Sequence, residues 1–208
     1  VLERFERVLY LSVGSAYTGN VTAARKWQAA NDPDGRLTIL DTGAASGKLG
    51  LTALAVARSA SRAKSAEAML HFARQTVAHC EELVFLDQLK YLVAGGRISR
   101  TGGFFGDLFR VKPVVSPTAD GVTKVGVVRR AGDQLPMAIE HLEPALESAS
   151  GPLILLEYTD NRERVDGEIR PALQERFPQA EILLTPLSLT AGVHMGPGTW
   201  AVAWLPQG

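Results

Sequence analysis

Short apolar runs alternate with segments of helical pattern through the first 85 residues, and this alternation restricts the fold more than any other feature. Val8–Val13 and Leu37–Leu40 have the length and composition of buried strands. A segment of helical pattern follows each of them. Parallel strands need a crossover of about a dozen residues, so the pattern predicts parallel β-α-β units in a Rossmann-like lobe. Leu83–Asp87 is expected to add a third strand to this parallel sheet.

The pattern changes after Gly96. Residues 111–130 contain two strand-like runs around an Asp-Gly pair, Asp120–Gly121, which is typical of a β-hairpin. A helix is expected from Asp133 to Ala149, and strand and helix patterns then alternate to the C-terminal run GTWAVAWL. These features predict a second α/β lobe with a mixed, largely antiparallel sheet. We place the domain boundary at residue 87, which gives domains 1–87 and 88–208.

The segment between the two patterns, Leu86–Val115, combines a cation, a glycine turn and an aromatic helix. Gly95–Gly96 ends a short amphipathic helix, and Arg97 follows at once. A polar, glycine-rich stretch then leads into a helical segment that carries Phe104 and Phe105. A cation and a helix N-terminus beside an apolar face suit a ligand with an anionic head and an apolar body. Alternatively, Arg97 caps the carbonyl groups of the preceding helix and the phenylalanines belong to the core.

Polar residues follow the first strand. Ser15, Thr18 and Gly19 lie between that strand and a helix that Asn20 is expected to cap. Ligands of open α/β sheets bind outside the carboxyl ends of the strands, and hydroxyl and N–H groups at a helix start can bind a carboxylate. The same residues can also serve as plain helix caps, and spacing alone does not separate the two roles.

His194 lies in a glycine- and proline-rich stretch between two apolar runs, which predicts a loop. A neutral imidazole can donate one hydrogen bond and accept another. The Gly-Pro-Gly sequence after Met195 provides backbone that can approach a ligand closely. A binding role and a purely structural role for this histidine both remain open at this point.

Composition and motif content exclude several functional classes. The 22 basic and 22 acidic residues balance, so no excess of positive charge indicates a nucleic-acid partner. No apolar run approaches the roughly 20 residues of a membrane span. Cys80 is the only cysteine, so an internal disulfide is ruled out and a reducing cytoplasm is expected. Histidine spacing indicates no metal site. Gly43–Lys48 is one residue short of a phosphate loop, with Leu49 where a hydroxyl would bind magnesium.

Three motifs resemble the DegV family of bacterial fatty-acid-binding proteins. The middle motif is LKYLVAGGRIS, residues 89–99, followed by VKPVV, residues 111–115. The last is GVHMGPGTWAV, residues 192–202, which is similar to the Gly-x-His-x-Gly-Pro-Gly signature of that family. The first is VGSAYTGNVTAA, residues 13–24, which looks like a diverged form of the family's Ser-Gly-Thr loop, with Asn20 in place of the threonine.

The resemblance implies a ligand, a partner and site residues. It implies that the chain binds a long-chain fatty acid and presents it to a separate fatty acid kinase, which phosphorylates the carboxyl group in a route to phospholipids. Thr18 would take the place of the serine that contacts the carboxylate, Gly19 matches the motif glycine, and Ser15 would match a second loop serine. Arg97 and His194 would lie near the head group, beside Phe104 and Phe105.

On this resemblance the chain is a cytoplasmic lipid carrier with no catalysis, metal or cofactor of its own, and brief contact with a membrane surface is allowed. Family members also carry a further N-terminal segment, with a Thr-Ser-x-Pro loop that binds the carboxylate, ahead of the part that resembles Val1. Two alternatives stay open. One is an acyl- or phosphoryl-transfer enzyme that uses Ser15 or Thr18 with His194, and the other is a binding module for a polar metabolite.

Overall fold

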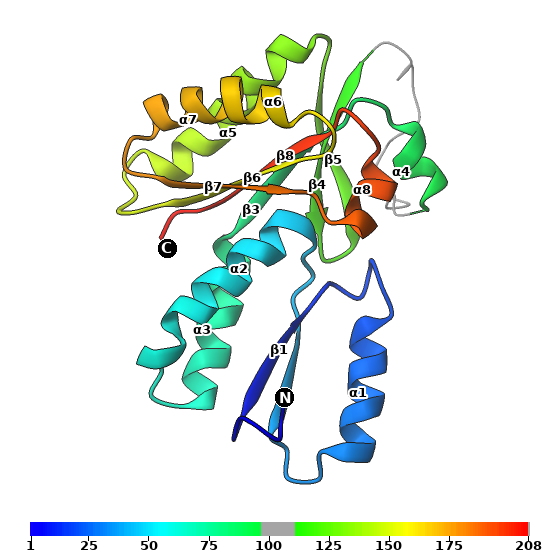
Figure 1. Ribbon diagram of the computed structural model, residues 1–208, viewed down its shortest axis with the longest axis vertical. Helices are drawn as coiled ribbons and strands as arrows, with labels where there is room; N and C mark the ends of the chain where they lie inside the picture. Colours follow the sequence, from blue (N-terminus) through cyan, green and yellow to red (C-terminus); the bar gives the residue numbers. More distant parts are fainter. Residues whose placement is uncertain (97–110, 208) are drawn as a thin grey trace.

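The structure is a computed structural model that describes residues 1–96 and 111–207, and it shows an elongated molecule with two lobes (Figure 1). The smaller lobe, at the bottom of Figure 1, contains a two-stranded parallel sheet. The larger lobe contains a six-stranded sheet in which antiparallel pairs predominate. The predicted α/β fold, with a parallel sheet and a mixed second sheet, is therefore confirmed.

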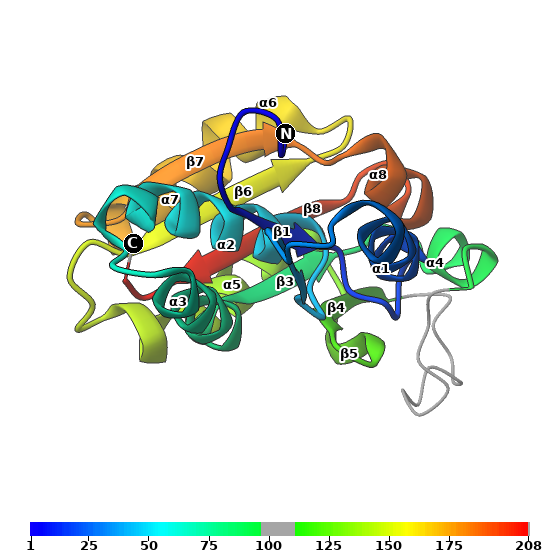
Figure 2. The same ribbon diagram turned by 90° about the horizontal axis from the view of Figure 1, so that it is seen from below.

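The first part of the chain forms the smaller lobe and the helices that join it to the larger one. Its elements are β1 (Val8–Ser12), α1 (Asn20–Asn31), β2 (Leu37–Asp41), α2 (Ser46–Ser59), η1 (Ala60–Arg62) and α3 (Ala66–His79). α1 lies on one side of the two strands, and α2 and α3 lie on the other (Figures 1 and 2). The side chain of Ser65 accepts a hydrogen bond from the Ala68 N–H at 3.1 Å, which caps α3.

The rest of the described chain forms the larger lobe. Its elements are β3 (Glu81–Phe85), α4 (Lys90–Ala94), β4 (Lys112–Thr118), β5 (Gly121–Val128), η3 (Ala131–Asp133), α5 (Gln134–Leu146), β6 (Leu153–Tyr158), α6 (Arg162–Arg164), the π-helical turn η4 (Val165–Ile169), α7 (Arg170–Arg176), β7 (Glu181–Pro186), α8 (Leu189–Met195) and β8 (Trp200–Leu205). The strand order is β5-β4-β3-β8-β6-β7. Among the described strands of this sheet, only β6 and β7 pair in parallel, and the helical segment from α6 to α7 supplies the crossover between them.

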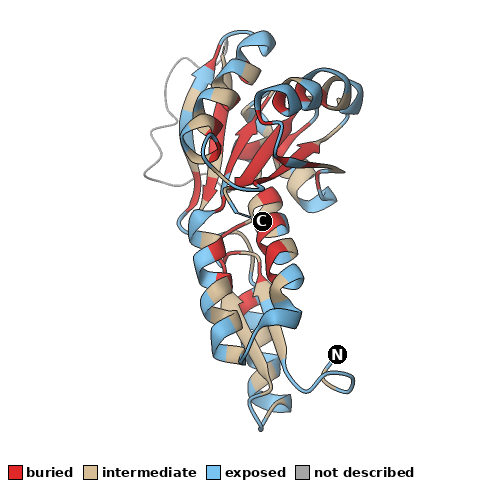
Figure 3. Ribbon diagram, turned by 90° about the vertical axis from the view of Figure 1, so that its left-hand side faces the viewer, coloured by how far each residue is buried: buried red, intermediate tan, exposed pale blue. Residues whose placement is uncertain are grey.

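Helices cover both faces of the large sheet. α5 and the segment from α6 to α7 lie on the upper face in Figure 1, and α2 lies beneath the lower face. On the upper face the ring of Trp200 stacks on Phe85 with 4.3 Å between ring centroids. The indole N–H of Trp200 donates to the Gln134 side-chain oxygen at 2.9 Å, so this buried polar group is satisfied. Figure 3 shows the buried residues concentrated along this sheet.

Two local predictions are wrong. The run that contains β3 does not join the parallel sheet of the smaller lobe, because β3 pairs antiparallel with β4 and β8 in the large sheet. The domain boundary at residue 87 stays a prediction.

The second wrong prediction concerns Asn20. Its side chain does not cap α1, since Gly19 is the N-cap and Asn20 is the first helical residue. The Asn20 N–H instead donates to the Thr18 hydroxyl at 3.2 Å.

Within the described residues, each helix is too short or too polar to cross a lipid bilayer.

Candidate functional site

A cavity of about 290 Å³ lies where the two lobes meet. Apolar side chains from the large sheet and from α4 supply much of its wall, among them Val84, Leu92, Val115 and Val122. Polar side chains reach it from three other segments, namely the loop after β1, the start of α2, and α8. A mostly apolar hollow with a few polar groups is the usual form of a site for a small organic ligand.

Thr18 and His194, which are 176 positions apart in the chain, both line this cavity. Thr18 is half-buried in the loop that leads into α1, and His194 is half-buried in the last turn of α8. The other two predicted residues of the same loop do not line the cavity. Ser15 is exposed, with its N–H bonded to the Asp41 carboxylate at 3.1 Å, and Gly19 is exposed at the N-cap of α1.

The segment that carries His194 is a helix, so the prediction of a loop is wrong. Ser188 begins α8, because its side-chain oxygen accepts a hydrogen bond from the Ala191 N–H at 3.2 Å. Gly196, with a φ of 81°, ends the helix. The glycine-rich sequence that suggested a loop thus forms the end of a short helix that directs His194 at the cavity wall.

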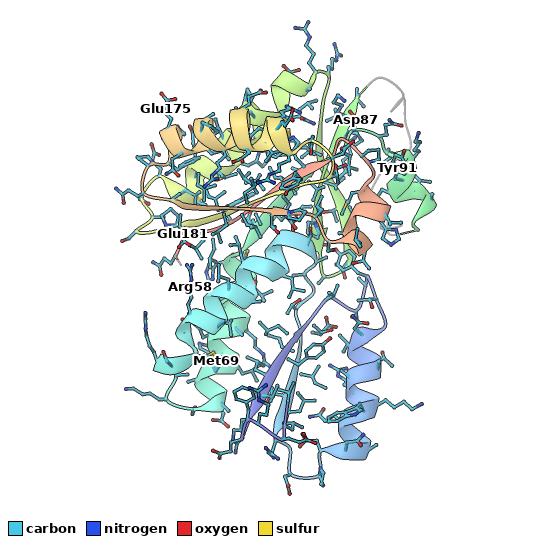
Figure 4. The ribbon with its side chains drawn as sticks, in the orientation of Figure 1. Arg58, Met69, Asp87, Tyr91, Glu175 and Glu181 are labelled. Atoms are coloured by element: carbon cyan, nitrogen blue, oxygen red, sulfur yellow. The ribbon has the colours of Figure 1, made fainter. Side chains whose placement is uncertain are left out.

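Two sequence motifs come together beside His194. α4 packs against α8, and the backbone of Gly95 lies so close to the His194 ring that a Cβ atom at Gly95 would collide with it. Gly196 likewise has no room for a Cβ atom, because the ring of Tyr91 occupies that space. Figure 4 shows Tyr91 on α4, on the side of the molecule where α8 lies. The glycines at these positions therefore permit close packing of α4 on α8.

Tyr17 fixes the Thr18 loop to the larger lobe, and the sequence analysis missed it. Its hydroxyl donates to the Thr118 carbonyl at 2.7 Å and accepts from the Thr118 N–H at 2.8 Å. Burial is the main cause that raises the pKa of Tyr17 to about 12. The tyrosine is half-buried and also lines the cavity, so it joins the loop after β1 to the end of β4. No local sequence pattern marks such a long-range bond.

Ser46 also lines the cavity and was missed. Its hydroxyl donates to Glu157 at 2.9 Å. Glu157 is 4% exposed and Glu82 is 1% exposed. Glu82 accepts hydrogen bonds from the N–H groups of Gly47 and Lys48 at 3.2 and 2.9 Å. A signal was present, because acidic residues inside the otherwise buried strands EELVF and LILLEY are unusual.

The two glutamates have perturbed pKa values. Burial, followed by the charge of Glu157, raises the pKa of Glu82 well above its ordinary value. Burial also raises the pKa of Glu157. Each carboxyl group also affects the pKa of the other, and a hydrogen bond between them requires a proton on one of them.

Arg97, Phe104 and Phe105 lie outside the described residues. In residues 1–96 and 111–207, no three histidine, cysteine, aspartate or glutamate side chains are grouped as a metal ion would require.

Comparison with known proteins assigns the chain to a family. Residues 1–207 match the family described as "Uncharacterised protein, DegV family". The chain belongs to the DegV family. A DegV domain-containing protein of Clostridium perfringens is 26% identical over 202 residues, which cover 95% of this chain and 69% of that protein. The resemblance inferred from the three motifs is thus confirmed.

Solved DegV structures share the fold. A DegV family protein from Thermus thermophilus, whose structure is described as showing fatty acid binding, is 25% identical with a TM-score of 0.88. The alignment covers 98% of this chain and 72% of that one. A DegV family protein from Eubacterium eligens, solved with heptadecanoic acid, is 12% identical with a TM-score of 0.82, covering 97% and 73% of the two chains. This second likeness concerns the fold alone.

Proposed function

We propose that this DegV-family chain binds a long-chain fatty acid in the cavity between its lobes. The observation that carries the proposal is the cavity itself, in which Thr18 and His194 share a wall with apolar side chains of the large sheet. Burial of one methylene group contributes about 0.8 kcal/mol, so a long acyl chain can supply most of the affinity. The fatty acid binding described for the Thermus thermophilus relative supports the same ligand class.

The polar side chains of the cavity are suited to the carboxylate end of the ligand. The Thr18 hydroxyl and the His194 imidazole can each donate a hydrogen bond, and such bonds offset the hydration that a carboxylate loses on burial. Arg97 would add a charged partner, and Phe104 and Phe105 would add apolar surface. These last three assignments stay predictions from the sequence.

The same site favours a carrier over an enzyme. Among the described side chains, no carboxylate is hydrogen-bonded to His194 to orient it as an acid-base catalyst would require. We therefore propose that the bound acid is presented to a separate fatty acid kinase in the cytoplasm, which supplies ATP and phosphorylates the carboxyl group. Brief contact with a membrane surface would allow the acid to enter and leave.

The lipid-binding proposal is tested by analysis of the purified protein. The protein is denatured, extracted with organic solvent, and examined by mass spectrometry for fatty acid in a ratio near one per chain. The delipidated protein is then titrated with vaccenic acid. A protein that yields no fatty acid and takes up none in the titration would contradict the proposal.

The carrier proposal is tested by following ATP and acyl phosphate. The protein alone is expected to leave ATP and fatty acid unchanged, and acyl phosphate is expected only after a fatty acid kinase is added. His194→Ala is expected to reduce ligand retention in the complete system. ATP-dependent turnover by this chain alone, lost in His194→Ala or Thr18→Ala, would instead establish the transfer-enzyme alternative.

A further inference from the structure

We propose that Ser46 is a further contact for the ligand's carboxylate, and that the buried pair Glu157 and Glu82 couples this contact to the uptake of one proton. The inference rests on the proposed function, because it assigns residues to the same fatty-acid cavity. Neither Ser46 nor the glutamates belong to the motifs that placed the chain in its family.

Ser46 stands at the cavity in an unusual backbone conformation. Its φ is 50°, and among the described residues it is the only one other than glycine with a positive φ. Backbone of this kind is costly for a residue with a side chain and is often retained at functional sites. The side chain lines the cavity and its hydroxyl donates to Glu157 at 2.9 Å. One hydroxyl group thus connects the ligand space with the buried carboxyl pair.

The sheet register explains why the two carboxyl groups meet. Glu82 of β3 lies opposite Ala203 of β8, and Glu157 of β6 lies opposite Ala201. Ala201 and Ala203 are two positions apart, so both glutamates are on the same face of the sheet, on either side of β8. The start of α2 covers this face, and a Cβ atom at Gly47 would lie 2.7 Å from Glu157 Oε2. The small residues Gly47, Ala201 and Ala203 therefore leave space for the two glutamate side chains.

The hydrogen bonds of the pair are arranged around one proton. Glu82 accepts from the two N–H groups at the start of α2, and Glu157 accepts from Ser46. A proton shared between the two carboxyl groups completes the network. In this state the Ser46 hydroxyl donates its hydrogen to Glu157, so toward the cavity it can only accept a hydrogen bond.

A fatty-acid carboxylate in the cavity changes the direction of this hydrogen bond. The ligand accepts the hydrogen of Ser46, which leaves Glu157 without its donor. Glu157 then takes one proton from the solvent and donates it to the Ser46 oxygen, while the proton already shared with Glu82 stays in the pair. No covalent bond other than the new O–H bond is made or broken, and the ligand remains an anion. Binding therefore consumes one proton.

Other titratable groups surround the pair and define the useful pH range. Tyr17 approaches from the loop after β1 and Cys80 from the start of β3, and burial is the main cause that raises each pKa to about 12. Lys48 and Glu81 lie on the neighbouring backbone, Asp120 lies near Tyr17, and His194 faces the same cavity. Because Tyr17 and Cys80 stay protonated up to pH 9, measurements between pH 7 and 9 avoid them. The variant His194→Asn shows what the imidazole contributes.

The experiment is a calorimetric titration with vaccenate, the anion of vaccenic acid, kept below the concentration at which it forms micelles. Titrations at pH 7, 8 and 9, each in two buffers with different heats of protonation, count the protons taken up. The native protein is expected to take up close to one proton, and its apparent Kd is expected to rise by up to about tenfold per pH unit. Glu157→Gln is expected to keep its Kd within about twofold across the range.

Ser46→Ala is expected to bind at least about tenfold more weakly at pH 7, since a hydrogen bond to a charged group is lost, and to show no pH dependence. Glu175→Gln changes an exposed carboxyl group on α7 and is expected to match the native protein. If the native protein does not bind vaccenate, the proposed function fails along with this inference. If it binds without proton uptake, or if Glu157→Gln keeps the native pH dependence, the proposed function stands and this inference is overturned. The number of protons taken up is measured on the native protein, so this part of the test does not depend on the folding of any variant.

Discussion

At the scale of single residues, the buried glutamates make the stability of the fold depend on pH. Glu82 and Glu157 are almost fully buried, and burial raises the pKa of both above the value of an unfolded chain. The folded protein therefore holds more protons than the unfolded chain above about pH 4.3, where free glutamates ionise. The stability that these groups contribute is complete below that pH and is lost as the pH rises through the folded pKa values.

The loss of stability with rising pH gives a prediction for thermal unfolding. Between pH 6 and 9 the melting temperature of the native protein is expected to fall. The free energy of unfolding is expected to decrease by at most about 1.4 kcal/mol per pH unit for each proton released. Glu157→Gln is expected to flatten this dependence, because an amide donates to Glu82 without titrating. Calorimetric scans of both proteins at several pH values check this, and a native melting temperature that rises toward pH 9 would contradict it.

At the scale of secondary-structure elements, the site depends on how α4 packs against α8. Gly95 ends α4 and lies against the His194 ring, while Gly196 ends α8 and lies against the ring of Tyr91. Each glycine faces an aromatic ring of the opposite segment, so neither can gain a methyl group without a shift of that ring. The two motifs are thus coupled through packing.

A methyl group at Gly95 is therefore expected to disturb the site. Gly95→Ala should displace His194, weaken fatty-acid binding, and cost about 1–3 kcal/mol of stability through overpacking. Gly192→Ala is the matched control, because it adds the same methyl group within α8 where no atom lies within 4 Å of the new Cβ. Titration with vaccenic acid and chemical denaturation measure both effects. Equal behaviour of the two variants would show that the contact with His194 is unimportant.

At the scale of the whole molecule, a few long-range contacts hold the lobes around the cavity. Arg58 of α2 makes a two-pronged ion pair with Glu181 of β7, with both N···O distances at 2.7 Å (Figure 4). This pair is exposed and is expected to contribute little to stability. The double hydrogen bond of Tyr17 to Thr118 is half-buried and adjoins the cavity, so it is the more important of the two connections.

Loss of the Tyr17 hydroxyl is expected to loosen the cavity. Tyr17→Phe leaves the N–H and carbonyl of Thr118 without partners, which should cost about 1–3 kcal/mol of stability and speed the release of bound fatty acid. Tyr10→Phe, at a more exposed tyrosine of β1, serves as control. Stopped-flow measurement of ligand release compares them. Unchanged release from Tyr17→Phe would mean that this bond does not hold the cavity closed.

Features that depend on neighbouring residues could be predicted from the amino-acid pattern alone. Period and composition identified the strands and the longer helices but not α8, and Asp120–Gly121 identified the hairpin, because strand patterning and turn chemistry are local. The three motifs identified the family, and two of them contain Thr18 and His194, which line the same cavity.

Contacts between distant segments could not be predicted from the amino-acid pattern and became known from the folded chain. β3 has the apolar pattern of a parallel strand, yet it pairs antiparallel with β8, since pairing is set by the whole sheet and not by the strand's own residues. The contacts of Ser46 with Glu157 and of Tyr17 with Thr118 each span more than 100 positions. Such contacts form because burial forces polar groups to find partners wherever the fold brings them, and no local pattern records that choice.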